Sequence, residues 1–155
     1  MNKRRRRRRA AEPSAAAQLE QRGLPIVTEL SRVAKSADPP ERKLEGAMEI
    51  LFGAYGESDL DYSGSFLTGW LRAREDKQFR MTMAWQREQI RLSLEDILVE
   101  GVAGGAFRAD LDTSAVAAMI LSVAEACLLQ AATQGGAVPA EQLLRTVLRL
   151  VVSEA

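Results

Sequence analysis

The chain has 155 residues, with 21 lysines and arginines, 21 aspartates and glutamates, one cysteine and no histidine. This length is typical of one domain, which can bury a hydrophobic core without a metal ion or disulfide bonds. The lack of histidine excludes Cys–His and Ser–His nucleophile pairs, zinc-finger spacing and imidazole acid–base chemistry, so we expect neither an enzyme nor a cofactor. The single cysteine, Cys127, fits a reducing compartment, and we expect a cytoplasmic protein.

The zero net charge hides an asymmetry between the start of the chain and the rest. Lys3 and six arginines bring seven positive charges, and taking these from the 21 basic residues leaves 14 against 21 acidic ones. Residues 1–14 are therefore predicted to form a disordered basic tail, and they lack the apolar run of a signal peptide. Two interpretations of this tail stand, an arm that binds nucleic acid or an anionic membrane, and a solvated tail or a stretch that results from where the reading frame was taken to begin. The candidate nucleic-acid contacts are Arg4, Arg5, Arg6, Arg7, Arg8 and Arg9.

Two helices are predicted in the first part of the chain after this tail. Apolar periodicity over residues 15–33 predicts a helix that is interrupted or kinked around residues 23–25, which include a glycine and a proline. The next helix should begin with Asp38 as its N-cap and Pro39 as its first residue, and end near Gly56.

The middle of the chain predicts two further helices. Residues 59–74 contain Gly64 and Gly69, which weaken a helix but let a neighbouring helix approach closely. Residues 76–102 form the longest periodic segment, a central helix of about seven turns. A glycine corner at residues 101–105 should then end this helix in the left-handed conformation, with an aromatic residue folded back over the last turn.

That aromatic residue is Phe107, and a strongly apolar helix follows it. Asp112 or Thr113 should cap this helix, which runs to about residue 133 and is apolar on almost every side. It must be covered on more than one side, and a second copy of the chain supplies the second cover. Glu125 near its centre argues against a membrane span.

The last helix should start at Pro139 and pack antiparallel against the preceding one, because the connection between them is short. No segment shows the alternation of a strand. The predicted fold is therefore an all-α bundle of about six helices, whose last two form a hairpin that dimerises as a four-helix bundle. The predicted homodimer interface consists of Ala115, Ala118, Met119, Ser122, Val123, Leu144, Val147, Leu148 and Val151.

Aromatic, methionine and polar side chains at helical spacing are candidates for a ligand cavity, although such residues also form ordinary core. Glu125 either faces a ligand or pairs with an arginine or a backbone donor, since a buried carboxylate without a partner is costly. Two glutamines on the central helix either join the cavity or lie on an exposed face. The candidate ligand-binding residues are Phe52, Tyr55, Phe66, Trp70, Met83, Trp85, Gln86, Gln89 and Glu125.

Residues 95–112 have the sequence EDILVEGVAGGAFRADLD, and a small-residue run follows at residues 114–118. This segment resembles the C-terminal regulatory domain of the TetR family of bacterial transcription regulators, in which a long helix ends in such a glycine and Phe-Arg pattern. Residues 70–76 also resemble the family's passage into the long helix, and the resemblance covers roughly residues 38–152. Residues 125–128 match imperfectly, because the family often has Asp/Glu-Gly-Leu there.

The resemblance implies a regulator that binds a small, largely apolar effector and forms a homodimer. Members of the family open with a three-helix DNA-reading domain that contains a helix-turn-helix, and residues 1–38 have no counterpart of it. We therefore expect residues 15–155 to be the regulatory domain alone. DNA would be contacted only weakly through the arginine tail, or through a DNA-reading domain that is missing from this chain. The alternative is a dimeric helical scaffold whose polyarginine arm binds nucleic acid non-specifically.

Overall fold

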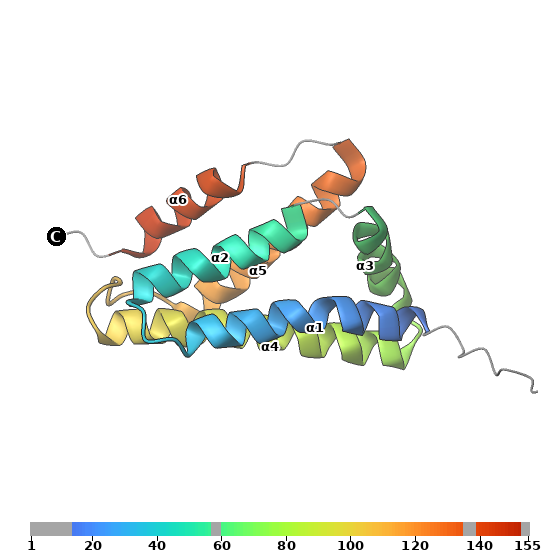
Figure 1. Ribbon diagram of the computed structural model, residues 1–155, viewed down its shortest axis with the longest axis horizontal. Helices are drawn as coiled ribbons and strands as arrows, with labels where there is room; N and C mark the ends of the chain where they lie inside the picture. The colour runs from blue at the N-terminus through green and yellow to red at the C-terminus, as the bar shows by residue number, and fades with distance from the viewer. Residues whose placement is uncertain (1–13, 57–59, 135–138, 153–155) are drawn as a thin grey trace, which may run out of the picture.

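The computed structural model describes residues 14–56, 60–134 and 139–152, and over these residues the chain is all-α, as predicted. The arginines at 4–9, predicted to contact nucleic acid, lie outside the described residues. In the described part a single isolated bridge, between Phe107 and Val152, is the only β-type pairing. The six helices are α1 (Ala15–Ala34), α2 (Pro40–Gly56), α3 (Leu60–Arg72), α4 (Lys77–Ala103), α5 (Thr113–Gln134) and α6 (Ala140–Val151) (Figure 1).

The helices form two layers with one helix across an end. Helices α1 and α4 lie side by side and are the most closely packed pair, and α2 and α5 cover them (Figure 1). Helix α3 stands at the end where α1 and α4 begin, and it contacts α1, α4 and α5. Helix α6 lies outside this arrangement, on α2. Two of the described helices, α4 and α5, therefore run through the middle of the bundle.

The N-termini of α4 and α5 are capped by aspartates, of which only the cap of α5 was predicted. The Asp76 carboxylate accepts hydrogen bonds from the backbone N–H groups of Gln78 at 2.8 Å and Phe79 at 3.4 Å. Of the two candidate caps for α5 it is Asp112 that acts, accepting from Ala115 N at 3.0 Å. Such caps satisfy backbone donors that have no partner within the helix.

The prediction for the start of α2 was wrong by one residue. The helix begins at Pro40, and the carbonyl of Pro39 accepts its first intrahelical bond, from Lys43 N at 3.0 Å. Asp38 is not the N-cap through its side chain, because its carboxylate accepts instead from Ser36 Oγ at 2.9 Å.

An interruption or a kink was predicted around residues 23–25, and α1 is not interrupted there, since it continues through Pro25. Proline removes one intrahelical hydrogen bond, and this helix is packed along α4. Gln86 of α4 donates from Nε2 to the carbonyls of Leu19 at 3.3 Å and Glu20 at 3.2 Å. The missing side chain of Gly23 leaves the space that the Gln86 amide occupies, so this glycine serves close packing and does not break the helix.

The glycine corner after α4 has the predicted form. Gly105 has a φ of 76°, in the left-handed region. The ring of Phe107 lies against Gly101, where a Cβ atom would overlap it, and Phe107 N donates to Gly101 O at 3.0 Å. This corner also holds the end of α6, since Arg108 N donates to the carbonyl of Val151 at 2.9 Å.

The predicted antiparallel hairpin of α5 and α6 is not confirmed, because α6 packs mainly on α2. Its apolar face is turned inward, which buries Val147 and Val151 in the chain's own core. Helix α5 contains one stretch, Thr113–Gln130, that is long and apolar enough to cross a membrane by length and composition alone. Of this stretch, 39% is buried within the chain.

Candidate functional site

A continuous line of side-chain contacts crosses four helices in the middle of the bundle. The rings of Tyr55 on α2 and Phe66 on α3 meet edge to face, with centroids 5.9 Å apart. Phe66 in turn lies edge-on to Trp70, at 6.4 Å between centroids. The guanidinium of Arg87 on α4 lies over the Trp70 ring at 5.2 Å, and it reaches Glu125 on α5. Four of these five residues were predicted to bind a ligand.

Close approach of α3 to its neighbours holds this line together. Gly69 faces both α1 and α4, and a Cβ atom added there would lie 2.9 Å from Leu19 Cδ2 and 3.1 Å from Met83 Sδ. The prediction that a glycine in this helix permits close packing is confirmed at Gly69, whereas Gly64 has no such neighbour. Because Trp70 follows Gly69 directly, this approach also brings the tryptophan ring to α4.

Glu125 is paired with an arginine, which was one of its two predicted roles. Arg87 donates from Nε to Oε1 at 2.6 Å and from Nη2 to Oε2 at 3.0 Å. The Glu125 side chain is 10% exposed and that of Arg87 36%. A two-point contact of this kind satisfies both carboxylate oxygens and fixes the guanidinium plane. Arg87 is thereby held between a carboxylate on one helix and an aromatic ring on another.

Two hollows adjoin Arg87, one on each side of α4. The hollow between α3 and α4 has a volume of about 160 Å³ and is lined by Trp70, Ala73, Arg80, Met83, Ala84 and Arg87. The hollow between α4 and α5 measures about 220 Å³ and is lined by Ala84, Arg87, Glu88, Arg91, Ala118, Leu121 and Ser122. A third hollow, between α2 and α6, has about 130 Å³ and is lined by Met48, Glu49, Phe52, Ala140, Glu141 and Leu144.

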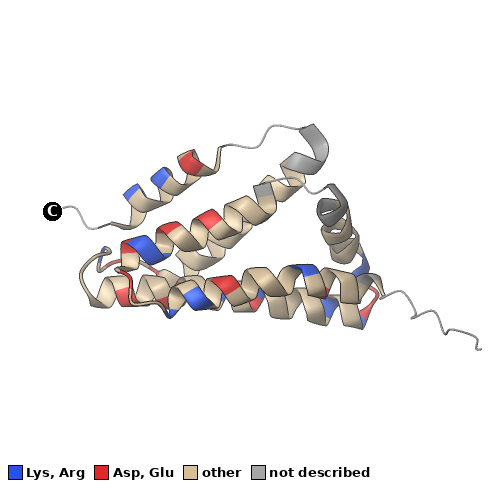
Figure 2. Cartoon of the chain, in the orientation of Figure 1, with Lys and Arg blue, Asp and Glu red and all other residues tan. Residues whose placement is uncertain are grey.

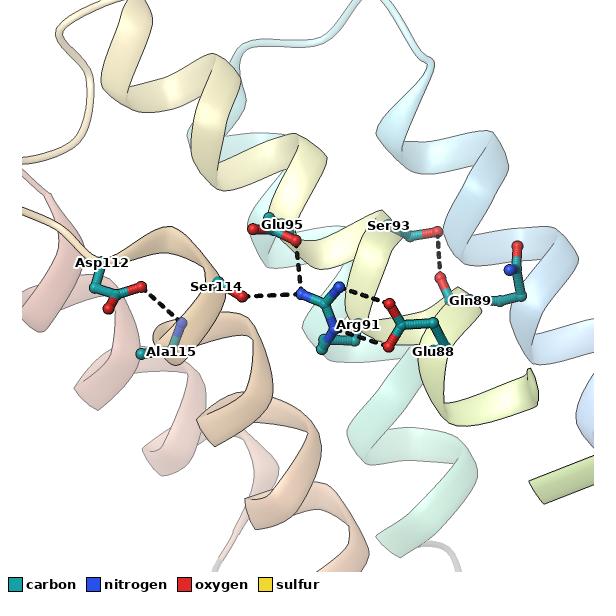
Figure 3. A network of polar contacts seen from close by, with 8 residues as sticks. All are labelled: Glu88, Gln89, Arg91, Ser93, Glu95, Asp112, Ser114 and Ala115. Atoms are coloured by element: carbon teal, nitrogen blue, oxygen red, sulfur yellow. Dashed lines mark hydrogen bonds and ion pairs between the residues drawn. The ribbon is translucent and has the colours of Figure 1, made fainter. Parts of the chain in front are cut away.

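A polar network borders the α4–α5 hollow (Figure 3). Arg91 donates to Glu88 at 3.0 and 2.7 Å, to Glu95 at 2.6 Å and to Ser114 Oγ at 3.1 Å. The hydrogen bond from Arg91 lowers the pKa of Glu88 below its ordinary value. The network joins α4 to the first turn of α5. Both carboxylates pair with the Arg91 guanidinium, so we interpret the network as a contact that supports the fold.

The remaining predicted ligand residues are distributed over different parts of the bundle. Met83 lines the α3–α4 hollow, and Phe52 lines the α2–α6 hollow. Gln86 is buried but turns to α1, as its hydrogen bonds to the α1 backbone require. Trp85 is 45% exposed, and Gln89 is partly buried, with neither lining the three hollows described.

The residues that sequence reasoning missed are the arginines and the small residues of these hollows. Arg87 lies one turn after Met83 on α4, and Arg80 lies two turns before Arg87, so all three share a face. That periodicity was the available signal. The prediction did not use it, because it considered only aromatic, methionine, glutamine and glutamate side chains as lining residues. Ala84 borders both hollows beside Arg87, and nothing in the sequence marks this alanine as a lining residue.

The predicted dimer residues lie in three environments, exposed, buried and partly buried. Four of them, Ala115, Ala118, Met119 and Ser122, are exposed on one face of α5. Val147 and Val151 are buried in the chain's own core, so they do not belong to a free surface. The other three, Val123, Leu144 and Leu148, are partly buried.

The described part of the chain is thus a bundle of helices with small hollows beside an ordered arginine, and its described residues hold no cluster of potential metal ligands. The profile of the C-terminal domain of BetI-type transcriptional repressors matches residues 40–155. The chain therefore belongs to the TetR family of transcription regulators, as its C-terminal regulatory domain.

A solved structure supports the fold assignment. The ketosteroid transcriptional regulator KstR2 of Mycobacterium tuberculosis superposes with a TM-score of 0.68 and 20% sequence identity. The match covers 90% of this chain and 72% of the KstR2 chain. At this identity the likeness shows the fold alone. A comparison with the sequences of characterised proteins gave no match.

Proposed function

We propose that residues 15–155 form the effector-binding and dimerisation domain of a cytoplasmic transcriptional regulator. The effector is a small, largely apolar molecule. The observation that carries this proposal is the contact line from Tyr55 through Trp70 to Arg87, which ends at an apolar hollow between α3 and α4. Hollows of this kind, with an apolar wall and a few ordered polar groups, are where small molecules bind in helical proteins.

Occupancy of this hollow would act on α1 through Met83. The Met83 side chain lines the hollow and also lies at the point where α3, α4 and α1 meet around Gly69 and Leu19. A ligand that displaces Met83 changes the packing of α1 on α4, the most closely packed helix pair of the chain. A ligand shifts an equilibrium only by its differential affinity for two states. In this proposal the two states are two positions of α1 on α4, and the ligand binds one of them more tightly.

The same proposal gives α5 the dimer contact. Its exposed face carries small and apolar residues, among them Ala118, Met119 and Ser122. A second copy of the chain would cover this face by two-fold symmetry, since residues near the axis would meet their own counterparts. DNA recognition would then depend on a helix-turn-helix outside the residues described.

The effector site can be tested with neutral probes and the Trp85→Phe variant. This variant keeps Trp70 as the single tryptophan, since the chain has two. We expect benzamide and hexanamide to change the Trp70 fluorescence in a saturable way. Ala84→Phe should abolish this change, because its ring fills the space beside Met83 and Arg87. Met81→Phe, on the same helix but 60% exposed, is the matched control and should bind as before. Unaltered binding to Ala84→Phe would place the effector elsewhere.

A further inference from the structure

The hollow between α3 and α4 combines an apolar wall with a charged rim. Its wall is formed almost wholly by carbon, from Trp70, Ala73, Met83 and the side-chain stems of Arg80 and Arg87. Arginine stems cover apolar surface in this way while their charged ends stay in water. With about 160 Å³ the hollow is smaller than the roughly 300 Å³ at which drug-sized pockets begin. It therefore fits a ring or a short alkyl chain that has its polar group at the rim.

The two arginines at the rim differ in how their charges are balanced. The charge of Arg87 is balanced by Glu125, to which it donates two hydrogen bonds. Arg80 donates from Nη1 to the backbone carbonyls of Ala73 at 3.1 Å and Arg74 at 3.4 Å, and it forms no ion pair with any acidic residue in the described ranges. A guanidinium has five N–H donors, so Arg80 keeps its net charge and further donors for a ligand.

The acidic residues near Arg80 do not balance this charge. Residues 72–80 contain four arginines and lysines against Glu75 and Asp76, an excess of two positive charges. Asp76 caps α4 and its carboxylate accepts from the backbone of Gln78 and Phe79. Figure 2 shows basic segments on either side of the turn from α3 to α4, with an acidic stretch in the turn itself. The rim of the hollow is therefore electropositive.

A cationic ligand finds no corresponding partner in this hollow. Glu125 does not line it, and Arg87 occupies both of its carboxylate oxygens. Pairing a buried carboxylate with a ligand cation would require breaking that contact and leaving Arg87 without a partner, which is costly.

We propose that the ligand of this hollow is a small aromatic or short-chain monocarboxylate, an inference that rests on the proposed function. Its apolar part lies against Trp70 and Met83, and its carboxylate accepts hydrogen bonds from Arg80. The planar guanidinium suits a carboxylate because two parallel N–H···O bonds can form. Arg87 remains with Glu125 and supplies the side wall.

The test compares acids with their neutral amides on the full chain carrying Trp85→Phe. Titrations of benzoate, benzamide, hexanoate and hexanamide are followed by Trp70 fluorescence. Each acid should bind about tenfold more tightly than its amide, because the hydrogen bond between two charged groups is stronger than the one that the neutral amide can form. Arg80→Gln should reduce the acids to the affinity of the amides and leave the amides unchanged. Lys77→Gln removes one charge from the same turn of α4 without touching the hollow, and it should change the affinity by about twofold or less.

The outcomes separate this inference from the proposed function. Equal binding of acid and amide, or an equal loss in Lys77→Gln and Arg80→Gln, would overturn the carboxylate assignment and leave the effector site standing. If neither acid nor amide perturbs Trp70, the effector site and the carboxylate assignment both fail. Arg80→Lys provides a second variant, which keeps the charge without the planar fork, and it should retain a preference for acids over amides that Arg80→Gln lacks.

Discussion

Both carboxylate oxygens of Glu125 accept hydrogen bonds from Arg87, at 2.6 Å from Nε and 3.0 Å from Nη2. The pair joins α5 to α4, as the hydrogen bond from Arg91 to Ser114 also does nearer the start of α5. The Glu125 side chain is 10% exposed, so its carboxylate depends on Arg87, which also lies over Trp70, for its hydrogen bonds. The contact therefore fixes the wall of the α3–α4 hollow.

Removing the charge of Glu125 should destabilise the fold. Glu125→Gln keeps the shape but loses the charge-assisted contact, and we expect a loss of about 1 to 2 kcal/mol in the free energy of unfolding, reduced by the partial exposure of Arg87. The control is Glu29→Gln, which breaks an exposed pair with Arg32 and should cost less. Urea denaturation measures both, and equal losses would contradict a special role for the Arg87 pair.

Replacement of both partners sharpens that test. Arg87→Met combined with Glu125→Leu leaves no buried charge without a partner, so it should recover part of the stability lost in Glu125→Gln. If the double variant is less stable than both Arg87→Met alone and Glu125→Leu alone, the arginine supports the fold by other contacts.

A side chain at Gly101 should disrupt the corner after α4. Its Cβ atom would overlap the Phe107 ring, which is itself buried, so we expect Gly101→Ala to cost about 1 to 3 kcal/mol. Gly53→Ala is the matched control, because Gly53 is helical with no neighbour within 4 Å, and alanine there should stabilise by about 0.5 to 1 kcal/mol. Thermal unfolding compares the two, and effects of the same sign would contradict the geometry.

The Gln86 amide should hold the first half of α1 on α4. In Gln86→Met its hydrogen bonds to the carbonyls of Leu19 and Glu20 are lost. We expect faster amide hydrogen exchange in the first half of α1 and no change in α6, measured by mass spectrometry. Gly23→Ala displaces the same amide, so its effect should not add to that of Gln86→Met. Additive effects would mean that the two residues act separately.

Burial should make Cys127 unreactive in the folded protein. Burial raises the pKa of this thiol above its ordinary value, so the thiolate fraction near pH 8 is lower than in an unfolded chain. We expect labelling by a disulfide reagent to be slow in the folded protein and fast in urea. Equal rates in both conditions would contradict the burial of α5 at this position.

The sequence was sufficient where local chemistry determines the structure. The cap of α5 at Asp112, the corner at Gly105 and the fold of Phe107 over Gly101 follow from residue types at fixed spacing, and all were predicted. The aromatic residues from Tyr55 to Trp70 were also predicted as a group, because helical periodicity places them on inward faces.

The sequence was insufficient where the partner lies on another helix. The amphipathic pattern of α6 shows that it buries Val147 and Val151, but the same face fits α2 or α5 equally well by pattern. Periodicity likewise assigns Gln86 to no particular neighbour, and only the tertiary structure shows that it bonds to α1. The continuity of α1 through Pro25 depends on that packing too, since local propensity alone favours a break.

An arginine on the exposed face of α5 should dissociate the proposed dimer. Ala118 is exposed on this face, and Met119 and Leu129 are each 42% exposed, so apolar side chains lie open to solvent there. An obligate interface buries about 2,000 Å² or more, and a charge at its centre would be desolvated without a partner. We expect Ala118→Arg and Ala118→Glu to be monomers by light scattering with size-exclusion chromatography. Both signs of charge are needed because Ala118 lies beside Arg91 at the α4–α5 hollow. Met81→Arg, on an exposed part of α4, should remain dimeric, and an unchanged mass of both Ala118 variants would place the dimer contact on another face.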